Sequence, residues 1–275
     1  KDGGIFAAHD IYYPKSIKNF KVVEEIKKSP RWTVLEQTKS RQGLIIAMKI
    51  PKDFELMQRV EKPIFMYKGI RKNSVDKEPA TSKWVKSLDH GIFYDVGANV
   101  GAYSLIAAKN NPYLKVYAFE PMYKNYFVLM ENVIANDMSN QIIALNCAIS
   151  DKDGFDNFNC HSLEMGSALS SLGKAVDYKG DRFKPVFVQN IACFSIDSLM
   201  SKLPLPDYIK IDVDSIETQI IKGAKTCLLK SVKSLLIEGD ERQYKMFNPL
   251  IKESGFKLVE IEEHSSTSNY IYNKQ

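Results

Sequence analysis

Two acidic residues follow apolar runs at matching places in the sequence. Asp95 lies in the stretch FYDVGANVGAYS, where an apolar run gives way to small residues and then to a helical pattern. Glu120 lies 25 positions later, directly after the apolar run LKVYAF. An acid at the end of a second strand can accept hydrogen bonds from both ribose hydroxyls. Pro121 and Met122 follow as an apolar pair that suits an adenine face. The pattern predicts a nucleotide-type site.

The small residues of the turn distinguish between cofactors. The dinucleotide fingerprint G-x-G-x-x-G would need glycines at 97, 99 and 102, but the chain has Gly97, Asn99 and Ala102. It has instead D-x-G-x-x-x-G, from Asp95 to Gly101. Glycines let a ligand approach the backbone, and the following helix N-terminus offers free N–H groups. Because a carboxylate repels a pyrophosphate and suits a cationic amino-acid end, the turn favours S-adenosylmethionine, which carries a sulfonium and an ammonium group.

Further ionisable residues lie in the run YIKIDVD. Strand alternation places Lys210, Asp212 and Asp214 on one face, where burial is costly unless the charges are paired or used. Glu217 and Glu238 are expected at the same rim, where each could orient an acceptor hydroxyl. Methyl transfer from a sulfonium needs an aligned acceptor and a group that weakens the acceptor's proton. These five residues are therefore candidate catalytic groups; a structural Lys–Asp ion pair and helix-cap or solvated acids stay open as alternatives.

Four stretches, in this order, resemble the FkbM family of S-adenosylmethionine-dependent methyltransferases: DVGANVGAYS, AFEP, NCAISDKDG and IKIDVDSIE. The resemblance covers roughly residues 90–240. It implies a class I methyltransferase fold and O-methylation of sugars or natural products. It also implies which residues hold the cofactor: Asp95, Gly97, Asn99, Gly101, Tyr103 and Ser104 around the methionine and ribose, Glu120 on the ribose, and Met122 with Ala148 beside the adenine.

The chain departs from the family pattern after the fourth expected strand. Where the family resembles K-I-D-V-E-G-x-E, this chain has Asp214 in place of the glutamate and Ser215 in place of the glycine. The first change shortens a carboxylate by one methylene, and the second adds a side chain at a tight turn. We expect cofactor binding to persist and the acceptor side to differ from the family.

Alternating strands and helices would position these residues. The pattern predicts an α/β fold of the class I methyltransferase (Rossmann-like) type, a seven-stranded mixed sheet with helices on both faces, as a domain over residues 86–275. Strands are expected near 91–96, 114–119, 141–147, 206–213, 232–238, 256–262 and 268–272, and helices near 101–110, 122–136, 195–202, 215–229 and 241–253.

Two other segments do not follow this alternation. Residues 1–85 predict a small N-terminal α+β accessory or cap region, with a helix near 16–29, short strands near 43–51 and 63–69, and a polar linker at 71–82. The glycine-spotted segment 161–185 predicts a lid over the cofactor, with plain disorder as the alternative.

The composition indicates the class of protein and its cellular location. The 275 residues are 44% hydrophobic and 26% charged, and no apolar run approaches the roughly 20 residues of a membrane span. The start has neither a signal-peptide core nor an initiator methionine, which is consistent with a chain trimmed or cut from a longer one. The four cysteines form no C-x-x-C pair, so reduced thiols and a cytoplasmic location are expected. The scattered histidines predict no metal site.

Charge is distributed unevenly. Residues 1–90 hold 19 Lys/Arg and 11 Asp/Glu, whereas residues 91–275 hold 19 and 22. The basic region favours an anionic partner such as a sugar nucleotide, a lipid-linked glycan, a membrane surface or a nucleic acid, or it merely aids solubility. Basic and aromatic residues do not interleave as on an RNA-binding platform, so no nucleic-acid platform is expected.

Together these features predict an S-adenosylmethionine-dependent O-methyltransferase that acts on a sugar hydroxyl in a glycan, polysaccharide precursor or glycosylated natural product. Two alternatives remain: a non-catalytic cofactor-binding module of a larger assembly, and a nicotinamide-dependent oxidoreductase, which the residue at Asn99 disfavours. The sequence leaves the oligomeric state and the identity of the acceptor open.

Overall fold

The computed structural model describes residues 5–9, 23–24, 26–29, 31–37, 44–50, 52–58 and 63–275. Its largest sheet has seven strands in the order β15-β16-β14-β13-β6-β7-β8. Only β16 of these strands runs antiparallel to its neighbours. The strands are β6 (Gly91–Val96), β7 (Leu114–Phe119), β8 (Ile142–Leu145), β13 (Tyr208–Ile211), β14 (Ser234–Gly239), β15 (Phe256–Glu263) and β16 (Ser268–Lys274). The predicted seven-stranded mixed sheet is confirmed.

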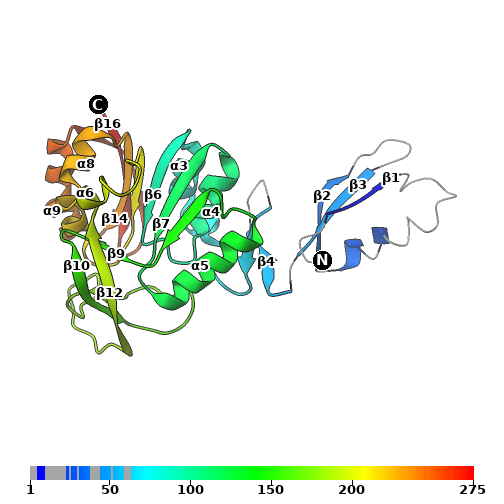
Figure 1. The fold of residues 1–275 in the computed structure, drawn as a ribbon, viewed down its shortest axis with the longest axis horizontal. Helices are drawn as coiled ribbons and strands as arrows, with labels where there is room; N and C mark the ends of the chain where they lie inside the picture. The colour runs from blue at the N-terminus through cyan, green and yellow to red at the C-terminus, as the bar shows by residue number, and fades with distance from the viewer. Residues whose placement is uncertain are drawn as a thin grey trace.

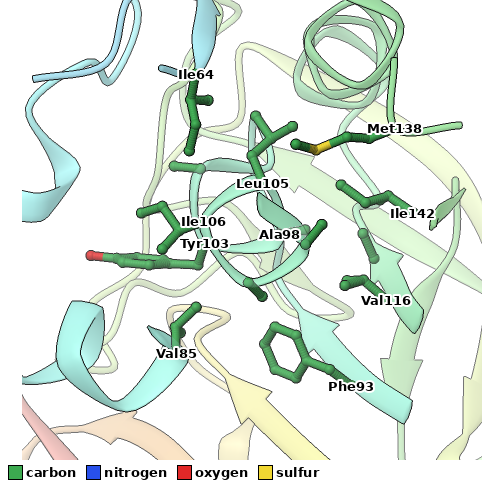
Figure 2. Packing of buried hydrophobic residues seen from close by; sticks show 14 of the residues in the cluster. Ile64, Val85, Phe93, Ala98, Tyr103, Leu105, Ile106, Val116, Met138 and Ile142 are labelled. Carbon is green, nitrogen blue, oxygen red and sulfur yellow. The ribbon is translucent and has the colours of Figure 1, made fainter. Parts of the chain in front are cut away.

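Helices cover both faces of this sheet (Figure 1). One face carries α3 (Pro79–Ser87), α4 (Ala102–Asn110) and α5 (Tyr123–Ala135), and the other carries α6 (Ile196–Leu199), α7 (Glu217–Lys222), α8 (Lys225–Lys230) and α9 (Glu241–Glu253). Each face has its own buried cluster, and strand alternation divides the side chains between them. Phe93 packs toward α4, as Figure 2 shows, whereas Tyr94 belongs to the opposite cluster. The helix predicted at 215–229 is two helices, α7 and α8.

A second, four-stranded sheet was not predicted. It has the order β11-β10-β12-β9 and consists of β9 (Ala148–Ser150), β10 (Gly154–Cys160), β11 (Ser171–Leu172) and β12 (Phe187–Ser195). The strand expected at 141–147 ends at Leu145, and the chain enters this second sheet three residues later. Most of the predicted lid segment connects β10 to β12, with β11 inside it.

The N-terminal part contains short strands. A three-stranded antiparallel sheet, in the order β1-β3-β2, consists of β1 (Ile5–His9), β2 (Trp32–Gln37) and β3 (Leu44–Lys49), and β4 (Phe54–Leu56) pairs with β5 (Phe65–Tyr67). Strands β3 and β5 confirm the strands predicted near 43–51 and 63–69. Residues 23–24 and 26–28 of the helix predicted at 16–29 are helical, and the rest of it lies outside the described residues.

The linker predicted at 71–82 is wrong. This segment contains α2 (Ser74–Lys77) and the start of α3, which begins at Pro79. Upstream of it, Ile64 and Met66 are buried in the same cluster as the helices of the main sheet. The backbone N–H of Phe65 donates to Asn136 Oδ1 just after α5. The core therefore continues across the domain boundary predicted between residues 85 and 86. Among the described residues, no helix combines the length and apolar character that crossing a membrane requires.

Candidate active site

A cavity lies at the carboxyl ends of β6, β7, β13 and β14, where ligands bind in open α/β sheets. It has two adjoining lobes of about 210 Å³ and about 310 Å³. We call the first the turn lobe, lined by segment 69–78, turn 97–103, Lys210 and Asp212. The second, the acid lobe, is lined mainly by Glu78, Glu120–Met122, Ser167–Ser170, Asp212–Asp214 and Glu238.

Gly97 and Gly101 are required by the chain itself. Both have a positive φ, +78° and +80°, a backbone conformation that side chains rarely adopt. A Cβ at Gly97 would lie 1.9 Å from the carbonyl oxygen of Asp212, and one at Gly101 would lie 2.3 Å from the Leu129 side chain. The expectation that a ligand keeps position 97 small is therefore corrected: the neighbouring backbone after β13 already does so. Gly97 also lines both lobes, whereas Gly101 lines neither.

Glu120 anchors the turn from the end of β7. Its buried carboxylate accepts the backbone N–H of Asn99 at 2.8 Å and that of Met122 at 2.9 Å. Burial is the main cause that raises the pKa of Glu120 to about 7. A carboxylate offers about four acceptor positions, so two remain for other donors, such as ribose hydroxyls. Asn99 donates from Nδ2 to the Ser167 carbonyl at 2.9 Å.

A small apolar pocket adjoins the acid lobe. Its walls include Pro121, Ala148, Phe158 and Leu172. Met122, 1% exposed, packs in one buried cluster with Ala148 and Phe158. Its volume is only about 20 Å³, so it is an apolar recess in the cavity wall against which a flat ring can pack, and not a space that encloses one. The structure thus brings together Met122 and Ala148, the two residues predicted to flank an adenine.

Asp95 and Ser104 lie behind the cavity wall and line neither lobe. Ser104 donates to Asp95 Oδ2 at 2.6 Å, and Lys210 Nζ lies 4.0 Å from Asp95 Oδ1. Burial raises the pKa of Asp95. Asp95 and Ser104 therefore stabilise the wall of the cavity and do not line the cavity itself. Tyr103, in contrast, lines the turn lobe, and its hydroxyl points away from the core cluster (Figure 2).

Lys210, Asp212 and Glu238 form a chain of ionisable side chains at the ends of the neighbouring strands β13 and β14. Lys210 is 2% exposed, and its Nζ donates to Asp212 Oδ2 at 2.7 Å. Burial opposes ionisation of Asp212, but the Lys210 ammonium and hydrogen bonds from Glu238 and Lys210 lower its pKa to about 2. Burial and the charge of Asp212 raise the pKa of Glu238 to about 10, so Glu238 is protonated at neutral pH. Asp212 is thus a fixed anion.

Asp214 has different chemistry from Asp212. It adopts φ +71°, which Asp tolerates better than most residues, and its Oδ2 accepts the N–H of Leu169 at 2.6 Å. Burial, then the charge of Asp212, raises the pKa of Asp214 to about 6. A carboxyl that titrates near neutrality and faces a cavity is a candidate proton acceptor.

Glu217 does not join this group. It is 2% exposed, lines neither lobe, and accepts a hydrogen bond from Gln243 Nε2 of α9. The N–H of Val213 also donates to it, and burial raises its pKa to about 8. Its side chain therefore closes the turn between β13 and α7 in the structure, away from the cavity.

Segment 69–78 contributes residues that the sequence did not predict. Arg71, Lys77 and Glu78 line both lobes, although this segment was interpreted as mainly a linker. Arg71 Nε donates to the Gly166 carbonyl at 3.0 Å, which joins this segment to the loop before β11. The one available signal was charge: RKNSVDKEP carries five ionisable side chains shortly before the first strand of the sheet. Opening and closing of the loop, as a lid, stays a prediction.

The strand order, the antiparallel β16 and the cavity at the carboxyl ends of the central strands define a class I methyltransferase. Comparison with protein families agrees: the methyltransferase FkbM domain matches residues 95–266, more than half of the chain. The protein belongs to the FkbM methyltransferase family.

Individual relatives are distant. The chain is 25% identical to methyltransferase sdnD of Sordaria araneosa, over 60% of this chain and 73% of that protein. It is 26% identical to the hexuronic acid methyltransferase AglP of Haloferax volcanii, over 54% of this chain and 55% of that protein. The crystal structure of an FkbM methyltransferase from Methylobacillus flagellatus matches with a TM-score of 0.48 and 16% identity, over 67% of this chain and 44% of that one. The chain thus spans about half of the second relative and less than half of that structure.

Proposed function

We propose that this methyltransferase uses S-adenosylmethionine to methylate a hydroxyl of a sugar, in a glycan or a glycosylated natural product. The observation that carries the proposal is one continuous acid lobe that is lined both by Glu120 and Met122 and by Asp212, Asp214 and Glu238. Groups suited to a nucleoside therefore share a single space with groups suited to a positive charge and to proton transfer.

The residues present fit this cofactor. Glu120 retains acceptor positions for the ribose, and the apolar wall that includes Ala148 and Phe158 offers a surface for one face of the adenine. The fixed anion of Asp212 fits the positive end of the molecule. Asn99 Oδ1 is buried and has no hydrogen-bond partner within the described part of the chain, so it can accept from a ligand donor. When bound, the cofactor supplies a methyl group on a positively charged sulfur.

The chemistry at the acceptor follows from the carboxyl groups of Asp212, Asp214 and Glu238 in the acid lobe. Transfer forms a bond between the acceptor oxygen and the methyl carbon, and the carbon–sulfur bond breaks with its electron pair left on sulfur. The hydroxyl proton must leave, and we assign it to Asp214, whose pKa of about 6 lies nearer to neutrality than the pKa values of Asp212 and Glu238. An acceptor that is itself a carboxylate would need no such base, so the arrangement favours an ether over an ester product.

The nature of the acceptor draws on two further observations. The relative AglP is named a hexuronic acid methyltransferase, which supports a sugar acceptor. The basic excess before residue 90 supports an anionic one. A cytoplasmic location is part of the proposal, supported by four buried cysteines that are all free thiols.

Calorimetric titration tests the donor. We expect S-adenosylhomocysteine to bind with a stoichiometry of one and NAD not to bind. Binding of NAD alone would replace the proposal with the oxidoreductase alternative. Binding of S-adenosylhomocysteine without turnover on any glycan would favour a non-catalytic module.

A further inference from the structure

Glu78 occupies a helix-capping position without capping the helix. It directly precedes α3, and its side chain makes no cap hydrogen bond. Glu262 of β15 supplies the cap instead: its carboxylate accepts the N–H of Ala80 at 2.6 Å and that of Thr81 at 3.1 Å. An acid at a helix N-terminus satisfies free N–H groups. Because Glu262 does so from 182 residues away in the sequence, the carboxylate of Glu78 is left to face the cavity.

The surroundings of Glu78 give its carboxylate no directly bonded cation within the described part of the chain. It lines both lobes, and in the described part of the chain its carboxylate accepts one hydrogen bond, from the Tyr103 hydroxyl at 2.8 Å, and makes no ion pair. Burial, followed by the charge of Asp212, raises the pKa of Glu78. The buried ammonium group of Lys210 is already bound to Asp212. A half-buried carboxylate in this position is stabilised by a ligand that brings an ammonium group.

Lys77, the residue before Glu78, supplies the opposite charge. It lines both lobes and makes no ion pair among the residues that the structure describes. Its neighbour Lys72 is paired with Glu55 at 2.8 Å, so the two lysines are not equivalent. Adjacent acidic and basic side chains at one cavity wall match a group that carries both an ammonium and a carboxylate.

We propose that Glu78 and Lys77 form a subsite for the α-amino carboxylate end of the methyl donor, with Glu78 binding the ammonium group and Lys77 the carboxylate. The inference rests on the proposed function and extends the donor site to a segment that precedes the matched family domain. Segment 69–78 is thus a wall of the donor site, held in place by Glu262 and by the bond from Arg71 to Gly166.

Two ligands separate this subsite from the rest of the donor site. S-adenosylhomocysteine has the amino-acid end, whereas 5′-methylthioadenosine keeps the nucleoside and the sulfur but lacks that end. Both are titrated by calorimetry into the wild-type protein and into Glu78→Gln and Lys77→Ala. Glu78→Gln keeps the acceptor for the Tyr103 hydroxyl and removes the charge. Glu253→Gln, at an exposed acid near the end of α9, is the matched control, and thermal melting checks that each variant is folded.

For Glu78→Gln we expect the affinity for S-adenosylhomocysteine to fall about tenfold or more, the loss of one charge-assisted hydrogen bond, while that for 5′-methylthioadenosine changes less than about twofold. Lys77→Ala should weaken S-adenosylhomocysteine selectively as well. Equal losses for both ligands, or no loss in either variant, would overturn the inference. If Glu78→Gln does not fold, Lys77→Ala alone tests the inference. An unchanged affinity of Lys77→Ala for S-adenosylhomocysteine would then overturn it. Failure of the wild type to bind either ligand would instead refute the proposed function itself.

Discussion

The role of Asp214 as the proton acceptor predicts a specific dependence of turnover on pH. Its pKa of about 6 means that it is about one-tenth ionised at pH 5 and almost fully ionised at pH 8. If the ionised form removes the hydroxyl proton, kcat should rise about tenfold between these pH values and level off above about pH 7. The direction follows from the base: protonated Asp214 cannot accept a proton, so activity is lost as the pH falls through 6.

Steady-state formation of S-adenosylhomocysteine measures this profile. The donor must be saturating, because Glu120, with a pKa of about 7, titrates in the same range and acts on donor affinity. Asp214→Asn should lower kcat by about 10²–10⁴ and remove the rising limb. Asp214→Glu, which restores the family residue, is the matched control and should keep the limb. An Asp214→Asn variant that retains more than about one-tenth of the activity, with an unchanged limb, would refute the assignment.

Four other substitutions give further tests. Glu120→Gln should weaken S-adenosylhomocysteine binding by about 1.5–3 kcal/mol in calorimetry, and unchanged affinity would contradict a role on the ribose. Gly97→Ala should lower the free energy of unfolding by about 2–5 kcal/mol in urea titration, since its Cβ would meet the Asp212 carbonyl; a wild-type value would be the opposing result. Asp212→Asn should reduce turnover by about tenfold or more, because the fixed anion that we place at the positive end of the donor is lost, while the rise of kcat with pH that Asp214 sets should remain; a smaller loss in rate would contradict this placement. Burial raises the pKa of Glu217 from 4.5 to about 8, so the folded protein loses its protonated form of Glu217 as the pH rises. The free energy of unfolding of the wild type should therefore fall by about 2–3 kcal/mol between pH 6 and pH 9 relative to that of Glu217→Gln. If the free energies of unfolding of both proteins change with pH in parallel, Glu217 is not the cause.

The main sheet was predictable because its strands are buried apolar runs with a polar end. GIFYDV and LKVYAF each form one strand, and alternation in YIKIDVD places Lys210 and Asp212 together in the structure. The second sheet was not predictable in the same way. Strand β10, GFDNFNC, carries four polar or glycine residues, and its pairing with β12 is stabilised by contacts between residues that are far apart in the sequence.

The candidate site likewise combines residues that local sequence pattern predicts with residues whose position depends on contacts distant in the sequence. Glu120 and Met122 follow a strand directly, so local pattern was enough to place them at the cavity. Glu217 was assigned to the rim, but the turn after β13 directs its side chain to Gln243 of α9, a contact that spacing alone does not reveal. Glu78 was missed because its orientation depends on the cap from Glu262, in a strand at the other end of the chain.

Transfer of a labelled methyl group tests the central claim most directly. The protein is incubated with S-adenosylmethionine labelled in the methyl group and with a panel of neutral and uronic acid-containing glycans, and each product is treated with alkali. We expect label in a glycan that survives alkali, as a methyl ether does, with one S-adenosylhomocysteine formed per methyl transferred. Label released by alkali would indicate an ester and contradict the hydroxyl acceptor, and no transfer to any glycan by a folded protein that binds S-adenosylhomocysteine would contradict the proposed activity.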